Sequence, residues 1–175
     1  MVVLSILFFL LLLGKSNADF LQENIARQGT ATQSETYNYM GNYKLVEASR
    51  AIDGIKHGKD INGEVDFTHT KTTGSTAWWL LTLPTVYPIR QIKVFNRILQ
   101  PQRLSGVKIW VGVGLTGGNY DGAELIGTIT YQSGTNPYVF SNLHASGSSV
   151  QIQGGADYLS LAEVEVYVPF TDKGE

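Results

Sequence analysis

The amino-acid sequence predicts an all-β protein, either an antiparallel β-sandwich or a barrel. Apolar and polar residues alternate in several short segments, and no segment after the N-terminal apolar run keeps a helical period. Gly and Pro separate these segments, and the 175 residues include 19 glycines. With 43% hydrophobic residues, a chain of this length can bury one core. Regularly spaced strands with Gly- and Pro-rich loops are typical of antiparallel sandwiches and barrels.

Individual strands are expected where the alternation is clearest, at residues 92–95, 107–113, 150–152 and 163–168. Trp78–Leu83 is continuously apolar, which indicates a central strand that is covered on both faces. We therefore predict that Trp78 and Trp79 are core residues and not a stacking surface for a sugar. Pro84 and Pro88 are expected to separate strands. The polar segment Asn24–Gly63 is expected to form loops with one or two short helical turns, and Thr171–Glu175 a frayed tail.

The N-terminus has the pattern of an export signal. Val2–Gly14 is almost entirely apolar, and Ser16-Asn17-Ala18 follows it as a small-x-small cleavage pattern. The apolar run has the length of a signal-peptide core and is short for a membrane span. We expect residues 1–18 to be removed and residues 19–175 to form a single secreted, extracellular domain without membrane insertion. The alternative is an uncleaved anchor.

Composition excludes several classes of function. The formal net charge is −2, so no cationic field favours nucleic acid. The chain has no cysteine, which excludes disulfides, thiolate metal sites and a cysteine nucleophile. No catalytic motif is recognisable, and we predict that the protein is not an enzyme. Glu163 and Glu165 lie two residues apart on one strand face, an arrangement that is far more often solvated or structural than a glycosidase pair. His57 and His144 have no recognisable partner spacing.

Seven short strings, spread over the chain in order, carry a resemblance to a known family. They are Glu23–Ser34, Ala51–Gly54, Thr68–Thr70, Trp78-Trp79, Asn96-Arg97, Arg103-Leu104 and Tyr158–Tyr167. Through them the sequence resembles the F-type lectins, the fucose-binding fucolectin family, as a divergent member without cysteines. This resemblance implies a β-jelly roll of about eight strands and recognition of terminal L-fucose.

The resemblance also implies a sugar site made of one histidine and two arginines. The family's motif falls on His69, Arg97 and Arg103, whereas its Asp between the two arginines is replaced here by Leu99. Arg presents a rigid fork of donors, so two guanidinium groups and an imidazole can bracket vicinal hydroxyl groups. Ile98 or Leu99 would supply an apolar contact for the methyl group of the sugar. Without the resemblance, His69 could be a hydrogen-bonded strand-end residue, and the arginines solvated or ion-paired loop charges.

Two positions that are usually cysteine in the family are Phe67 and Ala162 in this chain. A large and a small apolar residue in place of the two half-cystines suggest a pair that conserves volume in the core.

A structural calcium site is also implied by the resemblance. Carried over residue by residue, the ligands are the carboxylates of Asp53, Asp66 and Glu163 and the backbone carbonyls of Arg50 and Ile55. Oxygen ligands from separated loops suit Ca²⁺ better than a transition metal. The alternative is that Asp53 only caps a turn.

These patterns favour a secreted lectin that binds fucosylated glycans and performs no chemistry. Single shallow sugar sites bind weakly, so strong retention would need several sites in a homo-oligomer. The alternative is a degenerate member that keeps the fold but serves as a protein-interaction or structural module, because the motif Asp and the cysteines are missing. The two interpretations differ in whether His69, Arg97 and Arg103 converge on one open surface.

Overall fold

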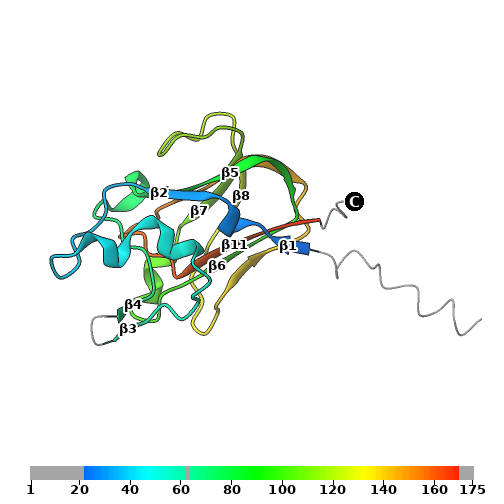
Figure 1. Ribbon diagram of the computed structural model, residues 1–175. Helices are drawn as coiled ribbons and strands as arrows, with labels where there is room; N and C mark the ends of the chain where they lie inside the picture. The colour runs from blue at the N-terminus through cyan, green and yellow to red at the C-terminus, as the bar shows by residue number, and fades with distance from the viewer. Residues whose placement is uncertain (1–21, 62–63, 170–175) are drawn as a thin grey trace, which may run out of the picture.

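Two antiparallel β-sheets face each other in the computed structural model, which describes residues 22–61 and 64–169 (Figure 1). The predicted all-β class is confirmed. The four-stranded sheet has the order β1 (Gln22–Asn24), β11 (Glu163–Pro169), β6 (Gln91–Phe95) and β9 (Tyr138–Phe140). The five-stranded sheet has the order β2 (Thr30–Gln33), β5 (Trp78–Ile89), β10 (Ala145–Gln153), β7 (Lys108–Gly112) and β8 (Glu124–Thr128). The expected signal segment 1–18 and the tail Thr171–Glu175 lie outside the described residues.

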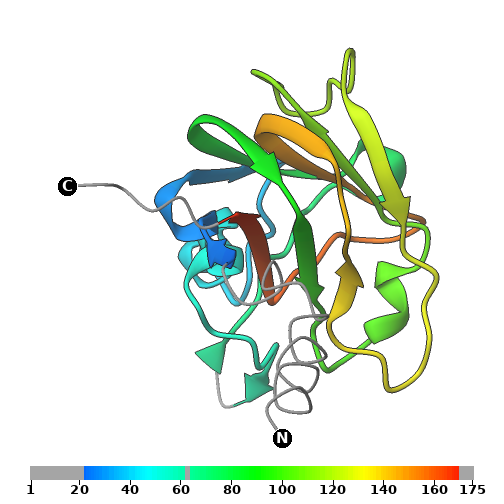
Figure 2. The same cartoon turned by 90° about the vertical axis from the view of Figure 1, so that its right-hand side faces the viewer.

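The alternation of apolar and polar residues in the sequence corresponds most clearly to alternating burial in β6. Ile92 and Val94 are buried, and they lie opposite Val166 and Val164 of the antiparallel neighbour β11. These side chains point between the sheets, where each contributes about 1.5–3 kcal/mol through removal of its apolar surface from water. The core of the sandwich is built from such inward-facing positions in both sheets (Figure 2).

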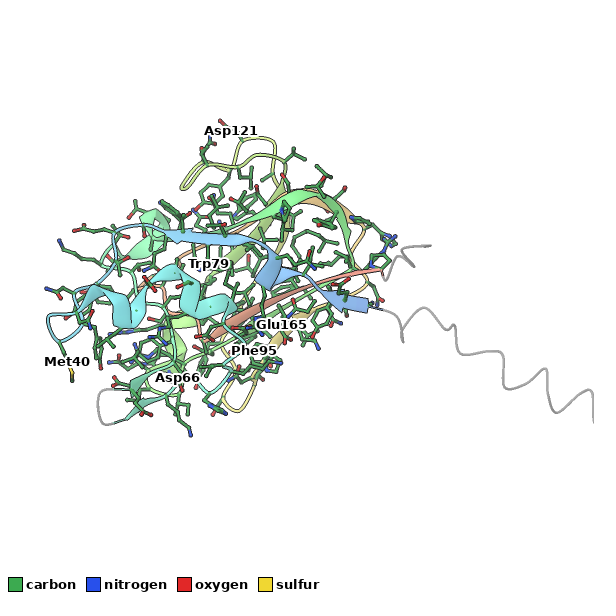
Figure 3. All side chains as sticks on the ribbon, viewed as in Figure 1. Met40, Asp66, Trp79, Phe95, Asp121 and Glu165 are labelled. Atoms are coloured by element: carbon green, nitrogen blue, oxygen red, sulfur yellow. The ribbon has the colours of Figure 1, made fainter. Side chains whose placement is uncertain are left out.

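β5 supplies the largest core residue. Trp79 is fully buried, and its indole Nε1 donates a hydrogen bond to the Ala48 carbonyl at 2.9 Å; Figure 3 labels its position in the interior. The prediction that both tryptophans belong to the core is correct for Trp79 only. Trp78 is half-buried on the opposite face of β5, where a Cβ placed on Gly117 would lie 2.2 Å from its ring. Successive strand residues point to opposite faces, so adjacent tryptophans cannot share one core.

Pro84 and Pro88 do not separate strands, as the sequence predicted, but lie within β5. β2 pairs with β5 only from Trp79 to Thr82, so the rest of β5 is an edge on that side. An edge position needs no amide donor toward the missing neighbour, and proline is tolerated there. The register with β10 also shifts between Gly147 and Ser149, opposite this part of β5. Val113, expected to point inward, is exposed because β7 ends at Gly112 and the chain turns at Gly114 with a φ of +63°.

The segment Asn24–Gly63 contains more regular structure than the expected loops. It includes β2, the short strand β3 (Asp60–Ile61), which pairs with β4 (Glu64–Val65), and the 3₁₀-helices η2 (Ala26–Gln28), η3 (Tyr43–Val46) and η4 (Ala48–Ile52). β2 was not predicted from the sequence because it is a mostly polar edge strand, and pairing with β5 sets its register. Two further 3₁₀-helices, η5 (Gly74–Thr76) and η6 (Pro101–Leu104), precede β5 and β7.

A second, smaller core lies beneath the loops at the β4 end of the sandwich. Phe67 and Ala162 are both fully buried there and pack with Val46 and Val65. The predicted apolar packing of Phe67 and Ala162 in the core is confirmed, whereas their replacement of two half-cystines stays a prediction. No helix within the described residues is long and apolar enough to cross a bilayer.

Replacement of Trp79 by Ala is expected to lower the free energy of unfolding by about 3–5 kcal/mol, because it empties the centre of the core and leaves the Ala48 carbonyl without its donor. Denaturant titration followed by circular dichroism measures the change. Trp78→Ala is the matched control and should cost clearly less. Equal losses in the two variants would contradict the assignment of Trp79 as the central core residue.

Candidate functional site

His69, Arg97 and Arg103 lie on two connections between strands, His69 on the one from β4 to β5, and both arginines on the one from β6 to β7. Figure 1 shows β4 at one end of the sandwich. His69 follows β4, Arg97 follows β6 and Arg103 lies in η6. Backbone hydrogen bonds tie these connections to neighbouring loops, from the His69 amide to the Val46 carbonyl at 3.1 Å and from the Ile98 amide to the Gly58 carbonyl at 2.9 Å. Gly58 has a φ of +60°, and a Cβ on it would lie 2.6 Å from the Arg97 Cα. Only glycine allows this approach of the two backbones.

The imidazole of His69 is held between two tyrosine rings. Its centroid lies 4.7 Å from that of Tyr37 and 5.1 Å from that of Tyr158. Its Nδ1 lies 2.7 Å from the Thr70 carbonyl oxygen. A carbonyl can only accept, so Nδ1 carries the hydrogen, and Nε2 of the neutral ring is left as an acceptor.

The ring of His69 is kept neutral by its surroundings. Burial lowers the pKa of His69, and the positive charges of Arg97 and Arg103 lower it further, whereas the Thr70 carbonyl and the Asp157 carboxylate oppose the shift. The imidazole is therefore an uncharged acceptor beside two guanidinium groups near pH 7.

Arg97 is held by stacking. Its Cζ lies 4.2 Å from the centre of the Phe67 ring, and its buried Nε has no hydrogen-bond partner. Burial and then the charge of Arg103 lower the pKa of Arg97, whereas the carboxylate of Asp60 raises it. Asp60 is itself fixed by a hydrogen bond from the Tyr39 hydroxyl, which is the main cause that raises the pKa of Tyr39 to about 12.

Arg103 has both an ion pair and an aromatic contact. Its Nε lies 3.2 Å from Oδ2 of Asp157, and its Cζ lies 5.2 Å from the centre of the Tyr158 ring. The other oxygen of Asp157 accepts the Tyr158 amide at 2.7 Å. Tyr158 thus stands between His69 and Arg103. The ion pair uses Nε and leaves the outer nitrogens of the guanidinium fork for other acceptors.

The structure brings the three residues together, since His69 and Arg103 contact the same Tyr158 ring and Arg97 stacks on Phe67, two residues before His69. It does not place them on the open surface that the sequence analysis expected. His69 is 5% exposed and Arg97 6%, and the Arg103 side chain is 17% exposed. The aromatic rings of Tyr37, Phe67 and Tyr158 cover much of their surface. Ile98 and Leu99 are by contrast 56% and 51% exposed on the neighbouring loop.

Sequence reasoning missed the residues that support this cluster. Tyr37, Asp60, Asp157 and Tyr158 were not predicted as functional, although Tyr158 opens one of the strings that carry the family resemblance. The distances along the chain from Asp60 to Arg97 and from Asp157 to Arg103 match no local pattern. Only contact in the folded chain relates these carboxylates to their arginines.

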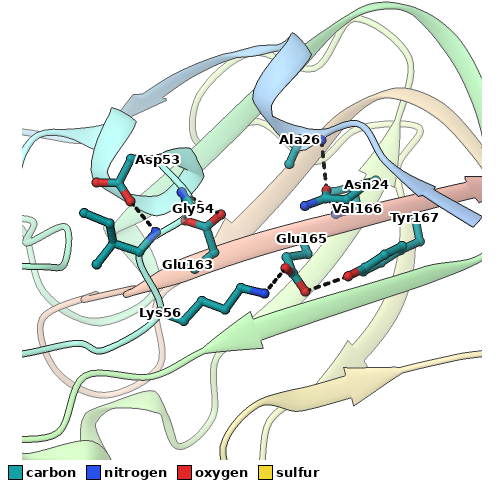
Figure 4. Close-up of polar contacts among 10 residues, drawn as sticks. Asn24, Ala26, Asp53, Gly54, Lys56, Glu163, Glu165, Val166 and Tyr167 are labelled. Atoms are coloured by element: carbon teal, nitrogen blue, oxygen red, sulfur yellow. Dashed lines mark hydrogen bonds and ion pairs between the residues drawn. The ribbon is translucent and has the colours of Figure 1, made fainter.

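Two of the predicted calcium ligands, Asp53 and Glu163, lie at the start of β11 (Figure 4). The Gly54 amide donates to both carboxylate oxygens of Glu163, each at 3.2 Å, and the Ile55 amide donates to Oδ1 of Asp53 at 2.8 Å. Asp53 therefore caps a turn, as the alternative interpretation held. Arg50 lies 3.9 Å from the Asp53 carboxylate, and Asp66 lies 3.8 Å from Nδ1 of His57, a partner that the sequence did not indicate. Among the described residues, no three His, Asp or Glu side chains form a ready metal cluster.

The carboxylate of Asp53 nevertheless interacts electrostatically with those of Asp66 and Glu163. Burial raises the pKa of Glu163 to about 7, helped by the charges of Asp53 and Glu165. Burial also raises the pKa of Asp53, and Asp66 adds to it. Glu165 has partners of its own in Lys56, at 2.5 Å, and the Tyr167 hydroxyl, at 2.9 Å. Glu163 and Glu165 are both buried, so the carboxylate pair of β11 is structural and not solvated.

Comparison with known proteins agrees with this architecture. No family model matches the sequence. Over 154 residues the chain is 31% identical to Fucolectin-3 of Anguilla japonica, a match that covers 86% of this chain and 82% of the relative. The chain belongs to the fucolectin, or F-type lectin, family. Fucolectin-4 of the same species is 34% identical over 114 residues, which is 63% of this chain and 60% of that protein.

Solved structures in the family have the same fold. A fucolectin from striped bass serum superposes with a TM-score of 0.70 at 31% identity and covers 86% of this chain. This chain spans 48% of that one, or about half its length. The lectin domain of lectinolysin, solved with the Lewis B antigen, has a TM-score of 0.65 at 26% identity and covers 82% of this chain and 95% of that domain.

The lowered pKa of His69 predicts a dependence of stability on pH. The unfolded imidazole titrates near 6.5, and the folded one titrates lower. Below about pH 6.5 the unfolded state therefore binds more protons than the native state, so the contribution of His69 to stability falls as the pH falls. His69→Gln should lack this contribution. Because the raised pKa of Glu163 acts in the opposite direction, the quantity to measure is the difference between wild type and variant in the free energy of unfolding from pH 7.5 to pH 5. A difference that does not change with pH would contradict the prediction.

Proposed function

We propose that the protein is a secreted lectin that binds the terminal L-fucose of glycans through His69, Arg97 and Arg103. The observation that carries this proposal is the meeting of one neutral imidazole and two guanidinium groups, from the β4–β5 and β6–β7 connections, around the rings of Phe67 and Tyr158. The names of the relatives, which are lectins, support the class of function. The pattern at residues 1–18 and the serum origin of the striped bass relative support secretion.

The hydrogen-bond directions in the cluster suit a sugar hydroxyl. A hydroxyl group donates one hydrogen and accepts others, so it can donate to Nε2 of His69 and accept from a guanidinium at the same time. Bonds from charged donors are stronger than neutral ones. Arg97 makes no ion pair within the described part of the chain, which leaves its donors for a ligand. If both ring nitrogens of His69 carried a hydrogen, Nε2 could no longer accept a hydrogen bond. The lowered pKa of His69 keeps the ring neutral near pH 7.

The apolar part of a 6-deoxy sugar needs a different partner. Ile98 and Leu99 are exposed on the loop that joins Arg97 to η6, and they offer an apolar surface next to the polar cluster. A methyl group buried against them contributes through the hydrophobic effect. A monosaccharide in so shallow a site should bind with a Kd from roughly millimolar to micromolar. Homo-oligomers would raise the avidity. The site performs recognition and no reaction.

We also propose that Asp53, Asp66 and Glu163, with the carbonyls of Arg50 and Ile55, hold a structural Ca²⁺. The donor set fits this ion. It consists of hard oxygen ligands. The buried Glu163 carboxylate accepts from the Gly54 amide, and burial and the charges of Asp53 and Glu165 raise its pKa more than the amide and Lys56 lower it. Bound calcium would neutralise this repulsion and join the turn after η4 to the start of β11.

One observation favours the alternative of a degenerate member that uses the fold for protein contact. His69 and Arg97 are nearly buried, so a sugar reaches them only over their aromatic neighbours. Binding measurements on the variants below separate the two functions.

Each of Arg97→Ala and Arg103→Ala should weaken binding of methyl α-L-fucoside by at least about tenfold, because one charge-assisted hydrogen bond of about 1.5–3 kcal/mol is lost. His69→Ala should weaken it by about twofold to tenfold, because a neutral hydrogen bond of about 0.5–1.5 kcal/mol is lost. Isothermal titration calorimetry and retention on fucose resin measure the effect. Arg103→Lys should also weaken binding, since lysine cannot reproduce the guanidinium fork.

Lys108→Ala on β7 removes an exposed cation elsewhere and serves as the control. The melting temperature of Arg103→Lys should stay close to that of the wild type, whereas His69→Ala should melt at a lower temperature because it empties a nearly buried place between two tyrosine rings. Wild-type protein that gives no heat with the fucoside, or variants that lose stability but keep affinity, would contradict the proposal and favour the structural role.

Removal of calcium by a chelator should lower the melting temperature, since a ligand that binds only the native state stabilises it by about 2.7 kcal/mol at 100 times its Kd. Differential scanning calorimetry with and without added Ca²⁺ measures the shift. Asp53→Asn should reduce it, whereas Asp121→Asn should not. Figure 3 labels Asp121 on a loop far from Asp66. A melting temperature that is the same in chelator and in calcium would remove the calcium site.

A further inference from the structure

A second group of aromatic side chains lies on the outer face of the five-stranded sheet. Two rows of residues cross β5, β10 and β7 there, and along each strand they alternate with residues of the core. The rows are Trp78, Gln153 and Lys108, and next to them Leu80, Gln151 and Trp110. Trp78 and Trp110 are half-buried, and Nε1 of Trp110 donates a hydrogen bond to Oε1 of Gln153 at 3.3 Å. Two indole rings and two side-chain amides therefore share one face of the sheet.

The connection from β7 to β8 forms a strap, residues 113–123, that lies across this face. Its backbone rests on the ring of Trp78, because a Cβ placed on Gly117 would lie 2.2 Å from that ring. The ring of Tyr120 lies on that of Trp110, with the two centroids 5.2 Å apart. The strap thus covers both tryptophans of the outer face.

Side chains of β10 hold the strap to the sheet. The Gly118 amide donates to Oε1 of Gln151 at 3.3 Å, and Nε2 of Gln151 donates to the Asn119 carbonyl at 2.9 Å. The Leu115 amide donates to the Ser149 hydroxyl at 3.2 Å. Gln151 and Ser149 are fully buried, although they lie on the outer face of the sheet. The strap therefore shields their polar atoms from water and binds them in its place.

Two features of the strap favour its movement. Gly114 and Gly122, near its two ends, have φ values of +63° and +72°, and beyond their chain neighbours no atom lies within 4 Å of a Cβ placed on either. The hydroxyl group of Tyr120 is buried without a hydrogen-bond partner among the described residues. An unpaired buried hydroxyl group makes the closed position less favourable, and lifting the strap returns this group to water. The strap is therefore a lid between two unobstructed glycine hinges.

The contacts that the strap makes are those that a neutral sugar chain would make. The face of Trp110 packs on the ring of Tyr120, and a pyranose with equatorial hydroxyl groups offers a similar apolar face of C–H groups. The Gln151 amide binds one donor and one acceptor of the strap, and a sugar hydroxyl group is both. Lys108 is the one charged residue in the two rows. The face therefore suits an uncharged ligand.

We propose that this outer face is a second glycan-binding surface for a chain of neutral β-linked pyranoses without fucose, and that the strap occupies it as an internal ligand. Trp78 and Trp110 lie two strands apart, roughly 10 Å, which matches an extended chain and not a single ring. The strap and the glycan compete for the same rings and the same amide. Free protein then binds the glycan only in proportion to the fraction of molecules whose strap is lifted. The site uses no residue of the fucose cluster and does not depend on the fucose proposal.

Removal of residues 115–121 tests the proposal. It joins Gly114 to Gly122, and two adjacent glycines suit a tight hairpin turn between β7 and β8. Chitotetraose, a neutral β-1,4-linked chain without fucose, should bind this shortened protein at least about tenfold more tightly than the wild type, because the strap no longer competes. Isothermal titration calorimetry measures both affinities. Trp110→Ala in the shortened protein should reverse the gain, and Tyr120→Ala in the full-length protein should tighten binding by about threefold or more.

Hydrogen exchange gives a second measurement, on the wild type. Saturating chitotetraose should speed exchange of the Gly118 amide, which loses its bond to Gln151 when the strap lifts. Asp121→Ala is the matched control on the strap, where Figure 3 labels this residue. It keeps both ring contacts and the Gln151 bonds, so its affinity for chitotetraose should equal that of the wild type.

A shortened protein that binds methyl α-L-fucoside as the wild type does, but shows no gain for chitotetraose, would overturn the proposal and leave the fucose proposal standing. A gain that survives Trp110→Ala would also overturn it. If circular dichroism shows that the shortened protein does not fold, Tyr120→Ala and the exchange of the Gly118 amide decide, and no change in either overturns the proposal. Absence of fucoside binding by the wild type would contradict only the fucose proposal.

Discussion

The repulsion between the guanidinium groups of Arg97 and Arg103, beside an imidazole that would add a third charge, is the constraint on which this end of the molecule depends. Cationic groups in a desolvated place are unfavourable unless other groups compensate for them. Aromatic faces provide one compensation, because Arg97 stacks on Phe67, Arg103 on Tyr158, and His69 between Tyr37 and Tyr158. Neutralisation of the imidazole provides another, because it reduces the number of charges from three to two.

The carboxylates that balance the remaining charges come from distant parts of the chain. Asp157 pairs with Arg103 from the connection that precedes β11, and Asp60 acts on Arg97 from β3. The sequence between Arg97 and Arg103 contains no acidic residue, so neither carboxylate belongs to the loop that carries the two arginines. A cluster assembled in this way depends on the whole end of the sandwich. The close approach of Gly58 to Arg97 and the packing of Phe67 with Ala162 hold that end together without a disulfide.

A second zone has the opposite charge. Asp53, Asp66 and Glu163 repel one another where the turn after η4 meets β11, and Gly54 supplies an amide to Glu163. Beside it, Glu165 is balanced by Lys56 and Tyr167 (Figure 4). The two carboxylates of β11 therefore differ in their surroundings, although they are two residues apart. A bound cation would balance the negative charge of Glu163 as Lys56 balances that of Glu165.

The sequence alone determined the all-β class, the strands β6, β7, β10 and β11, the apolar pair Phe67 and Ala162, and the family. Each of these follows from local alternation or from short strings of adjacent residues. Tertiary structure decided the rest. Which tryptophan is buried depends on the face of β5 that meets the second sheet, and Pro84 is tolerated because β2 ends before it reaches that residue. The near-burial of His69 and Arg97, and their support by Tyr37, Asp60 and Tyr158, come from loops that are far apart in sequence. Burial and charge coupling depend on distance in space, and no local pattern of residues encodes that distance.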